Sequence, residues 1–417
     1  MALKAALCLT AAWIALAHPG MGAAAYTVGD LVRTAIESNR ELEALRRRVD
    51  EARGLLRQAG ARPAPNLEVG ASTGKPLGSA GEEEFSAGFA QTLETAGKRG
   101  KRMSVAEKGV ALAEAELAER TRHLVIEIKL GRLEALTEQA KLDALDQILE
   151  SYGESLKLTE ARVGQGDAAP LESQLLLVEV NRTEALKRTI AGKVQVALAI
   201  LRRLCGIGVS EPLTLSPDAA AAPGGVYDLA ELRRRALELR PDLRMARIVE
   251  QQGAAEIALT EAGSRGDVTL SAQYALRNAQ IARLRDRDHL LAFGVSVPLF
   301  TKRRNLGNLE AAAARATGAR SMRQHLEAAI PLEVEAAWQH WEAARQSLAW
   351  LERGVVALSE KNLDIMRQAQ VLGQVRLLDV LNEQRRLVET RMGAIEAGAE
   401  VRRGAIELEQ AVGGDLK

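Results

Sequence analysis

Residues 142–163 read LDALDQILESYGESLKLTEARV, and no proline occurs between Lys98 and Val163. Within this stretch, mostly apolar residues recur at alternating spacings of three and four, which is the a and d pattern of a coiled coil. The positions are Leu142, Leu145, Leu149, Tyr152, Leu156, Thr159 and Val163. The pattern predicts one helix from Lys98 to about Val163, which at ~1.5 Å per residue would run roughly 100 Å. Compact domains do not contain helices of that length.

The same spacing recurs nearer the C-terminus, where it predicts a second long helix. Its positions are Leu348, Leu351, Val355, Leu358, Asn362, Ile365, Ala369 and Leu372. Pro331 lies near the start of this helix and predicts a kink or a break there, because proline removes a backbone donor. Four shorter helices rich in Ala, Glu, Arg and Leu are expected beside the long ones. They are Val28 to Ala61, Leu171 to Leu204, Leu229 to Ala262 and Leu377 to Val412.

The chain contains an internal duplication. Tyr26 aligns with Tyr227 at an offset of 201 residues, and the offset then rises to 206 and finally to 207, where Gly166 aligns with Gly373. A period this long indicates a duplicated half-molecule rather than a solenoid. Each half has the order helix, two strands, long helix, helix. The expected organisation is a first repeat over 26–211, a linker rich in Pro, Ala and Gly over 212–226, and a second repeat over 227–417.

Four short segments alternate strictly between two kinds of residue, which predicts strands with unlike faces. In the clearest one, Leu291, Phe293, Val295, Val297 and Leu299 alternate with Ala292, Gly294, Ser296 and Pro298. The others start near Leu67, Phe85 and Val268. Strands of about ten residues with one apolar face are typical of a lipid-facing barrel, and a soluble sandwich is the alternative. Four strands cannot close a barrel, so other chains would have to complete it. The segments 74–83 and 278–289 are expected to be loops.

Residues 1–25 differ from the rest of the chain. Lys4 precedes an apolar run from Ala5 to Ala17, and Ala23 to Ala25 offer an A-x-A cleavage site, so we expect a secretory signal peptide cut before Tyr26. No other stretch approaches the ~18 uncharged apolar residues of a membrane-spanning helix. Cys205 is the one cysteine beyond this segment, and we expect it to be a buried structural thiol.

The composition argues against several functional classes. Among 417 residues, 56 Lys and Arg nearly balance 55 Asp and Glu, which does not suit a nucleic-acid-binding protein. Two cysteines and five scattered histidines give no zinc-ligand spacing. No Ser, His and Asp arrangement or phosphate-binding loop occurs in the required context. We therefore expect no enzyme activity, no cofactor and no resident metal site.

Three local motifs, together with the duplication, resemble the TolC family of bacterial outer-membrane efflux factors over the whole chain beyond residue 25. At a predicted strand-to-helix junction, residues 91–94 read QTLE and run into 97–99, GKR. Residues 163–166 read VGQG and are followed by 170–172, PLE; in the second half, 371–374 read VLGQ and are followed by 378–382, LDVLN. The junction is most similar to the CzcC-like branch of heavy-metal efflux factors.

This resemblance implies a mainly α fold with a small β part, acting as a passive conduit without covalent chemistry. Three copies would form a homotrimer, in which four strands per chain close a shared 12-stranded β-barrel in outer-membrane lipid. The long antiparallel coiled-coil helices would form an α-barrel that extends into the periplasm. The conduit would join a periplasmic adaptor protein and an inner-membrane pump of the RND type in a tripartite efflux system. Heavy-metal cations are the expected cargo.

The resemblance also assigns roles to residues at the helix turns. The adaptor would contact the tips at Val163, Gly164, Gln165 and Gly166 in the first half, and at Leu372, Gly373 and Gln374 in the second. Just inside the tips, Glu172, Asp379 and Asn382 match positions that line the periplasmic entrance. With threefold repetition, the Asp379 carboxylates would form a negative ring that attracts cations.

Other interpretations of the same residues stay open at this point. The tip glycines could serve the turn alone, and Glu172 and Asp379 could simply complement helix dipoles. The conduit could carry drugs, or proteins in type I secretion. A periplasmic coiled-coil protein without a pore is a further alternative, and it predicts strands packed on protein and solubility without detergent.

Overall fold

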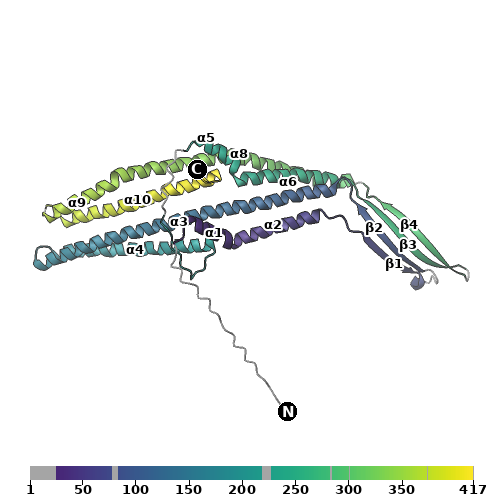
Figure 1. Cartoon of the computed structure of the whole chain (residues 1–417), viewed down its shortest axis with the longest axis horizontal. Helices are drawn as coiled ribbons and strands as arrows, with labels where there is room; N and C mark the ends of the chain where they lie inside the picture. Colours follow the sequence, from purple (N-terminus) through teal and green to yellow (C-terminus); the bar gives the residue numbers. More distant parts are fainter. Residues whose placement is uncertain are drawn as a thin grey trace, which may run out of the picture.

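The protein is elongated, with helical hairpins at one end and a β-sheet at the other (Figure 1). The computed structural model describes residues 25–77, 83–217, 227–281, 284–299, 301–372 and 374–416. The predicted signal peptide up to residue 24, most of the predicted linker and Gly373 lie outside the described residues. The fold class is as predicted, mainly helical with four strands.

The two halves have matching element orders. The first contains α1 (Val28–Ser38), α2 (Arg40–Ala59), β1 (Asn66–Thr73), a short 3-10 turn (Lys75–Leu77), β2 (Glu83–Leu93), α3 (Lys98–Gln165) and α4 (Pro170–Cys205). The second contains α5 (Leu229–Leu239), α6 (Pro241–Gly263), β3 (Val268–Ile281), β4 (Leu284–Ser296), α7 (Thr301–Arg304) and α8 (Leu306–Trp350). It continues with a π-helical segment (Leu351–Val356), α9 (Ala357–Val371) and α10 (Leu377–Val412).

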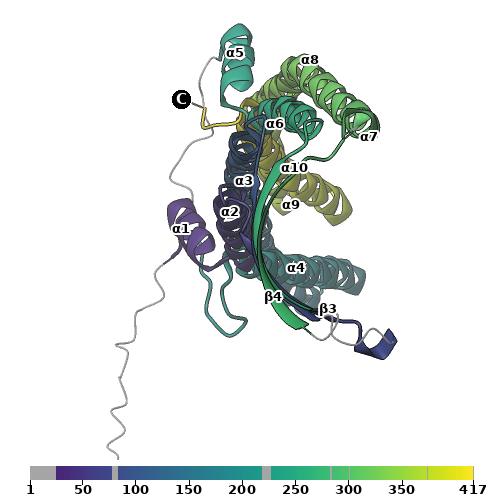
Figure 2. The ribbon, with the colours of Figure 1, turned by 90° about the vertical axis from the view of Figure 1, so that its right-hand side faces the viewer.

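The four strands form one antiparallel sheet in the order β1-β2-β3-β4. Figure 2 shows it as a curved band at the end of the helices. The register places Phe89 beside Ala272, and Ala272 beside Phe293, so the predicted apolar residues share one face. Within the described chain, the outer edges of β1 and β4 have no strand partner.

That apolar face is uncovered in the single chain. Leu67 is 75% exposed, Phe293 78% and Val295 71%. The opposite face carries small and polar residues, among them Ser271 and Gly294, which lie side by side. The strand pattern is therefore confirmed. An exposed apolar face of this kind marks a surface that a membrane or another protein covers.

The helices pack in two similar clusters around the middle of the molecule. In the first half, α1, α2 and α4 pack against α3, with Leu31, Ile128 and Leu201 fully buried. In the second half, α5, α6 and α10 pack against α8, with Ile330, Val334 and Leu408 fully buried. The two long-helix systems contact each other through α3, which packs on both α6 and α10. This shared packing fixes the positions of the two hairpins.

Two of the four shorter helices are broken, which corrects the prediction. The segment expected as one helix from Val28 to Ala61 divides at Asn39, whose side chain accepts hydrogen bonds from the backbone of Glu41 and Leu42 and so caps α2. The segment from Leu229 to Ala262 divides at Arg240, because Pro241 disfavours the helical conformation of the residue before it.

The second long helix is interrupted, but at a different place from the one predicted. α8 runs through Pro331, because the flanking Ile330 and Val334 are fully buried and their packing offsets the lost hydrogen bond. The irregularity is the π-helical segment Leu351–Val356, which we call the π segment. Beyond it the predicted coiled-coil stripe is wrong for the single chain. Leu358 and Ile365 are more than half exposed, whereas the neighbouring Leu363 is buried.

Two predicted irregular segments are partly ordered. Residues 278–289 continue the β3–β4 ladder as far as the pair Ile281 and Leu284, so most of this expected loop is strand. Before residue 218, the predicted linker packs on the first half. There, the Tyr26 N–H donates to the Thr214 carbonyl at 2.9 Å, and the Ser216 N–H donates to the Tyr26 carbonyl at 3.0 Å.

None of the helices in the described ranges carries a stretch long and apolar enough to cross a membrane.

Candidate functional site

The first hairpin tip is a tight glycine turn. Gly166 ends α3 with φ of 83°, its N–H donates to the Val163 carbonyl at 3.0 Å, and the Asp167 N–H donates to the Arg162 carbonyl at 2.9 Å. This double hydrogen bond is a Schellman motif, which needs a left-handed residue that glycine supplies without strain. Gly164 and Gln165 are exposed, and α4 begins at Pro170. At the first tip, backbone atoms that no side chain covers are therefore exposed to solvent at Gly164 and Gly166.

The second tip has a matching backbone bond. The Gln374 N–H donates to the Ala369 carbonyl at 2.9 Å, which is the counterpart of the bond from Asp167 to Arg162 at the duplication offset of 207. Leu372 is 70% exposed and Gln374 is exposed. Both tips lie at the end of the molecule opposite the sheet (Figure 1).

The predicted entrance residues lie in the first turns of the returning helices. Glu172 is half-buried in the first turn of α4. Asp379 is exposed in the first turn of α10, where its Oδ2 accepts a hydrogen bond from the Arg376 N–H at 3.3 Å. Asn382 is exposed one turn later, and its Oδ1 accepts from Arg385 at 3.4 Å. Asp379 thus caps its own helix while it keeps a solvent-facing carboxylate.

An ion pair with a buried carboxylate joins the two hairpins just behind the predicted entrance residues, and sequence reasoning missed it. Arg385 on α10 donates to Glu179 on α4, which is only 3% exposed. The hydrogen bond from Arg385 holds the pKa of Glu179 below its ordinary value. Tyr152 on α3 lies fully buried nearby, and burial raises the pKa of its hydroxyl to about 12. An acid on the mostly apolar buried face of α4 was the available sequence signal.

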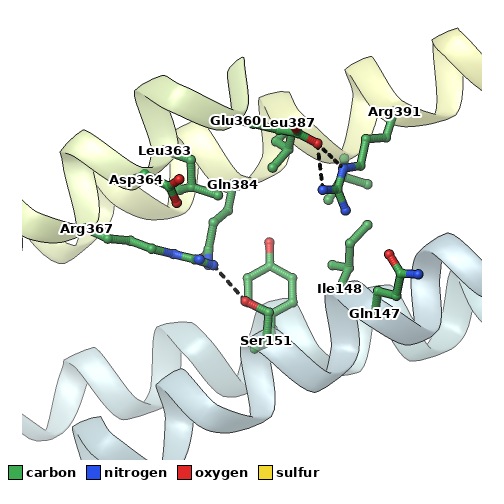
Figure 3. Close-up of a pocket in the computed structure, with 12 residues that line it drawn as sticks. Gln147, Ile148, Ser151, Glu360, Leu363, Asp364, Arg367, Gln384, Leu387 and Arg391 are labelled. Carbon is green, nitrogen blue, oxygen red and sulfur yellow. Dashed lines mark hydrogen bonds and ion pairs between the residues drawn. The ribbon is translucent and has the colours of Figure 1, made fainter. Parts of the chain in front are cut away.

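A cavity of about 340 Å³ is lined by residues of α3, α9 and α10 (Figure 3). Two interactions mark its walls. Arg367 on α9 donates from Nη2 to the Ser151 hydroxyl on α3 at 2.7 Å, and Arg391 on α10 donates to Glu360 on α9 at 2.7 Å. Of these two interactions, the one between Arg367 and Ser151 crosses the cavity, and the other joins α10 to α9 on one side of it.

The second face of the sheet is polar. Arg277 on β3 forms an ion pair with Glu84 on β2 at 2.9 Å, and the hydroxyls of Thr92 and Thr269 lie 3.0 Å apart. Polar and small residues on one face and exposed apolar residues on the other are what a sheet between water and lipid requires.

The described residues contain no cluster of three or more His, Cys, Asp or Glu side chains placed to hold a metal ion.

The model of the family described as "Outer membrane efflux protein" matches residues 31–207 and 232–414, which together make up most of the chain. The chain belongs to the outer membrane efflux protein family. The two matched stretches fall in the two halves of the duplication, and both include a hairpin tip with the predicted entrance residues beside it. The protein is accordingly an efflux protein of the outer membrane, and its helical part extends away from the sheet that meets the lipid.

Two known proteins are similar to this chain along most of their length. The chain is 24% identical to the cobalt-zinc-cadmium resistance protein CzcC of Cupriavidus metallidurans over 382 residues, covering 90% of this chain and 87% of the relative. It is 26% identical to the cation efflux system protein CusC of Escherichia coli O157:H7 over 403 residues, covering 93% and 86%. The solved structure of CusC matches the fold with a TM-score of 0.77 at 21% identity, covering 93% of this chain and 92% of that one.

Proposed function

We propose that the protein is the outer-membrane conduit of a tripartite export system and that its cargo is heavy-metal cations. The observation that carries the conduit is the sheet, which combines an exposed apolar face, a polar face and two unpaired edges. Open strand edges are excluded from lipid, because unpaired backbone groups there cost several kcal/mol each. Closure across copies of the chain satisfies them, and three copies give a ring of twelve strands.

The hairpin tips suit a partner protein in this proposal. Exposed glycine at Gly164 and Gly166 allows the close approach of helices from a periplasmic adaptor, and an inner-membrane pump of the RND type would supply the energy. The second tip would add Leu372 and Gln374 to the same contact.

The cargo proposal rests on two supports. The relatives CzcC and CusC are named for cobalt, zinc and cadmium resistance and for cation efflux. In addition, few basic residues accompany the acids at the entrance. No Lys or Arg lies between the first tip and Glu172, and only Arg376 lies between the second tip and Asp379. Three copies of each carboxylate around one opening would raise the local cation concentration. The third entrance position, Asn382, carries no charge, so each chain contributes two acids to the entrance.

The test is extraction from the outer-membrane fraction in detergent, mass measurement of the oligomer, and conductance in a planar bilayer. We expect a trimer with discrete steps that prefers cations, and Asp379→Ala should lower that preference by about twofold to fivefold while leaving assembly intact. Asn382→Ala is the matched neutral control. A water-soluble monomer without conductance would instead favour a periplasmic coiled-coil protein. In cells, loss of the gene should sensitise growth to cobalt, zinc or cadmium.

A further inference from the structure

The cavity lined by α3, α9 and α10 combines apolar and polar walls (Figure 3). Its volume of about 340 Å³ lies at the lower end of the range for pockets that bind small molecules, about 300–1,000 Å³. Two of the polar lining residues are almost completely buried, since Tyr152 is 1% exposed and Gln384 is 6% exposed. The apolar part of the wall consists of Ile148, Leu363, Leu387 and Val388. Such a lining suits a ligand that is itself part polar and part apolar.

The two buried polar side chains have no hydrogen-bond partner among the described residues. They are the hydroxyl of Tyr152 on α3 and the side-chain amide of Gln384 on α10. Neither group is sealed inside the protein, so both keep contact with accessible space, which at this depth is the cavity. Buried polar groups nearly always have a partner, which is protein, ordered water or a ligand. The partners of these two groups are therefore molecules that occupy the cavity.

Arg367 adds a positive charge to this wall that no acid of the described chain neutralises. Its Nη2 donates to the Ser151 hydroxyl at 2.7 Å, but no carboxylate oxygen among the described residues lies within 4.0 Å of its guanidinium nitrogens. Arg391, by contrast, donates to Glu360 at 2.7 Å. Asp364 balances the number of charges in the lining, but it is exposed and forms no ion pair with the described residues. The lining therefore offers a guanidinium that is free to pair with an incoming anion.

We propose that this cavity binds a small amphipathic monocarboxylate, which lies between α3 and the pair α9 and α10. Its carboxylate accepts hydrogen bonds from Arg367, because a planar guanidinium matches the two oxygens of a carboxylate. The hydroxyl of Tyr152 and the amide of Gln384 donate to the same polar end of the ligand. The apolar body packs on Leu363 and Leu387.

The polar groups of the cavity favour an anion over a cation. Burial raises the pKa of the Tyr152 hydroxyl to about 12, so this group keeps its proton at neutral pH and can donate. The guanidinium of Arg367 has donors and no acceptor. One unpaired guanidinium matches one negative charge, and the apolar wall disfavours a strongly hydrated ion such as phosphate. The site does not depend on the proposed function, because it requires only the folded chain.

The test is isothermal titration calorimetry of phenylacetate into the full-length protein, purified in detergent as the assembled oligomer. Phenylacetamide, which has nearly the same shape but no charge, is the matched control ligand. We expect one saturable site per chain for phenylacetate. Binding of the amide should be about tenfold weaker or more, because hydrogen bonds to a charged group are roughly twice as strong as those between neutral groups.

Three substitutions locate the site. Arg367→Gln should weaken phenylacetate binding about tenfold or more, because it removes the charged donor. Tyr152→Phe removes a single hydroxyl and should weaken binding about threefold to tenfold. Lys361→Gln is the matched control and should leave the affinity unchanged, since Lys361 is an exposed base of the same helix α9 that does not line the cavity. Thermal unfolding of each variant checks that the fold is kept. If Arg367→Gln does not assemble, Tyr152→Phe gives the same comparison.

Three results would overturn the proposal. One is the absence of saturable phenylacetate binding, which would mean that water alone or a neighbouring copy fills the cavity. The second is equal affinity for phenylacetate and its amide. The third is unchanged affinity in Arg367→Gln and Tyr152→Phe, which would place the bound phenylacetate elsewhere. Calorimetry requires no pump, adaptor or conductance, so these results are distinct from a failure of the proposed function.

Discussion

Arg385 on α10 forms an ion pair with Glu179 on α4 and so connects the second half of the chain to the first, 206 residues away. Glu179→Gln should therefore destabilise the protein by about 2 kcal/mol. This is less than the ~3–5 kcal/mol of a fully buried pair, because the Arg385 side chain is 39% exposed. Glu184→Gln is the control, since its partner Arg188 is fully at the surface, and it should change stability by less than about 0.5 kcal/mol.

The same pair predicts a pH dependence of stability. The pKa of Glu179 is lowered in the folded protein, so its contribution is complete above the ordinary carboxyl value and is lost as the pH falls through the folded value. The difference in melting temperature between the wild-type protein and Glu179→Gln should shrink as the pH falls from 7 to below about 4. Thermal unfolding followed by circular dichroism measures it. If the difference in melting temperature widened in acid, the ion pair would not be the cause of the pH dependence.

The glycines of the first tip should respond differently to alanine. Gly166→Ala should cost about 1 kcal/mol, because φ is 83° there and a side chain strains that conformation. Gly164→Ala should be neutral or stabilising, because Gly164 lies within α3 in open space. Gly206→Ala should cost more than either, since its Cβ would also lie 3.0 Å from the Ser38 carbonyl oxygen. Denaturant unfolding of the three variants gives the ranking.

A bulky residue at the same tip tests whether the glycines serve adaptor binding as well as the turn. Gly164→Phe leaves the fold intact but covers the exposed backbone, so it should weaken binding of the cognate adaptor about tenfold or more if the tip is the contact surface. Binding can be measured by surface plasmon resonance with the purified adaptor. Unchanged affinity would leave the glycines a role in the turn alone.

Adjacent residues of β4 test which face of the sheet meets lipid. Phe293→Arg places a charge on the apolar face and should cost about 2–4 kcal/mol in the bilayer midplane, so that little trimer reaches the membrane. Ala292→Arg places the same charge on the opposite face, where it should leave assembly intact and reduce cation conductance. The yield of heat-sensitive oligomer on gels compares the two. Equal losses would contradict the assignment of the faces.

Cys205 should resist thiol reagents in the folded protein. Its side chain is fully buried and its Sγ lies 3.7 Å from the Leu31 carbonyl oxygen, and burial raises the pKa of the thiol to about 11. Maleimide labelling at neutral pH should therefore proceed only as fast as the local core opens, and should become complete in denaturant. Rapid labelling of the native protein would show that this part of the core is open.

Periodicity predicted the parts of the fold that repeat. The a and d spacing through Leu145 and Tyr152 located α3 to within two residues at its C-terminal end, and strict alternation at Leu291 to Val295 gave the two faces of the sheet. These patterns are predictive because a helix or strand that is buried on one face repeats its apolar residues with the period of that element. The breaks at Asn39 and Arg240 were missed, because a side-chain cap or a following proline overrides a favourable helix composition.

The parts that depend on partners far along the chain were not predictable. Nothing around Glu179 identifies Arg385 as its partner, because the pairing follows from how α4 lies against α10. Leu358 is exposed and Leu363 is buried, against expectation, because the extra residue in the π segment moves the buried positions one residue later in the sequence. An alignment of the two halves places that one-residue difference between Glu333 and Gly373, and the burial pattern narrows it to residues 341–359.

The unpaired edges of β1 and β4 have a consequence for biogenesis. A single chain cannot enter the bilayer by itself, because its sheet would carry open backbone groups into hydrocarbon on both sides. Insertion and association are therefore one event. The rate of channel formation then depends on a higher than first power of the concentration of chains. Until neighbours arrive, the apolar face stays exposed to water, and unassembled chains are therefore prone to aggregate.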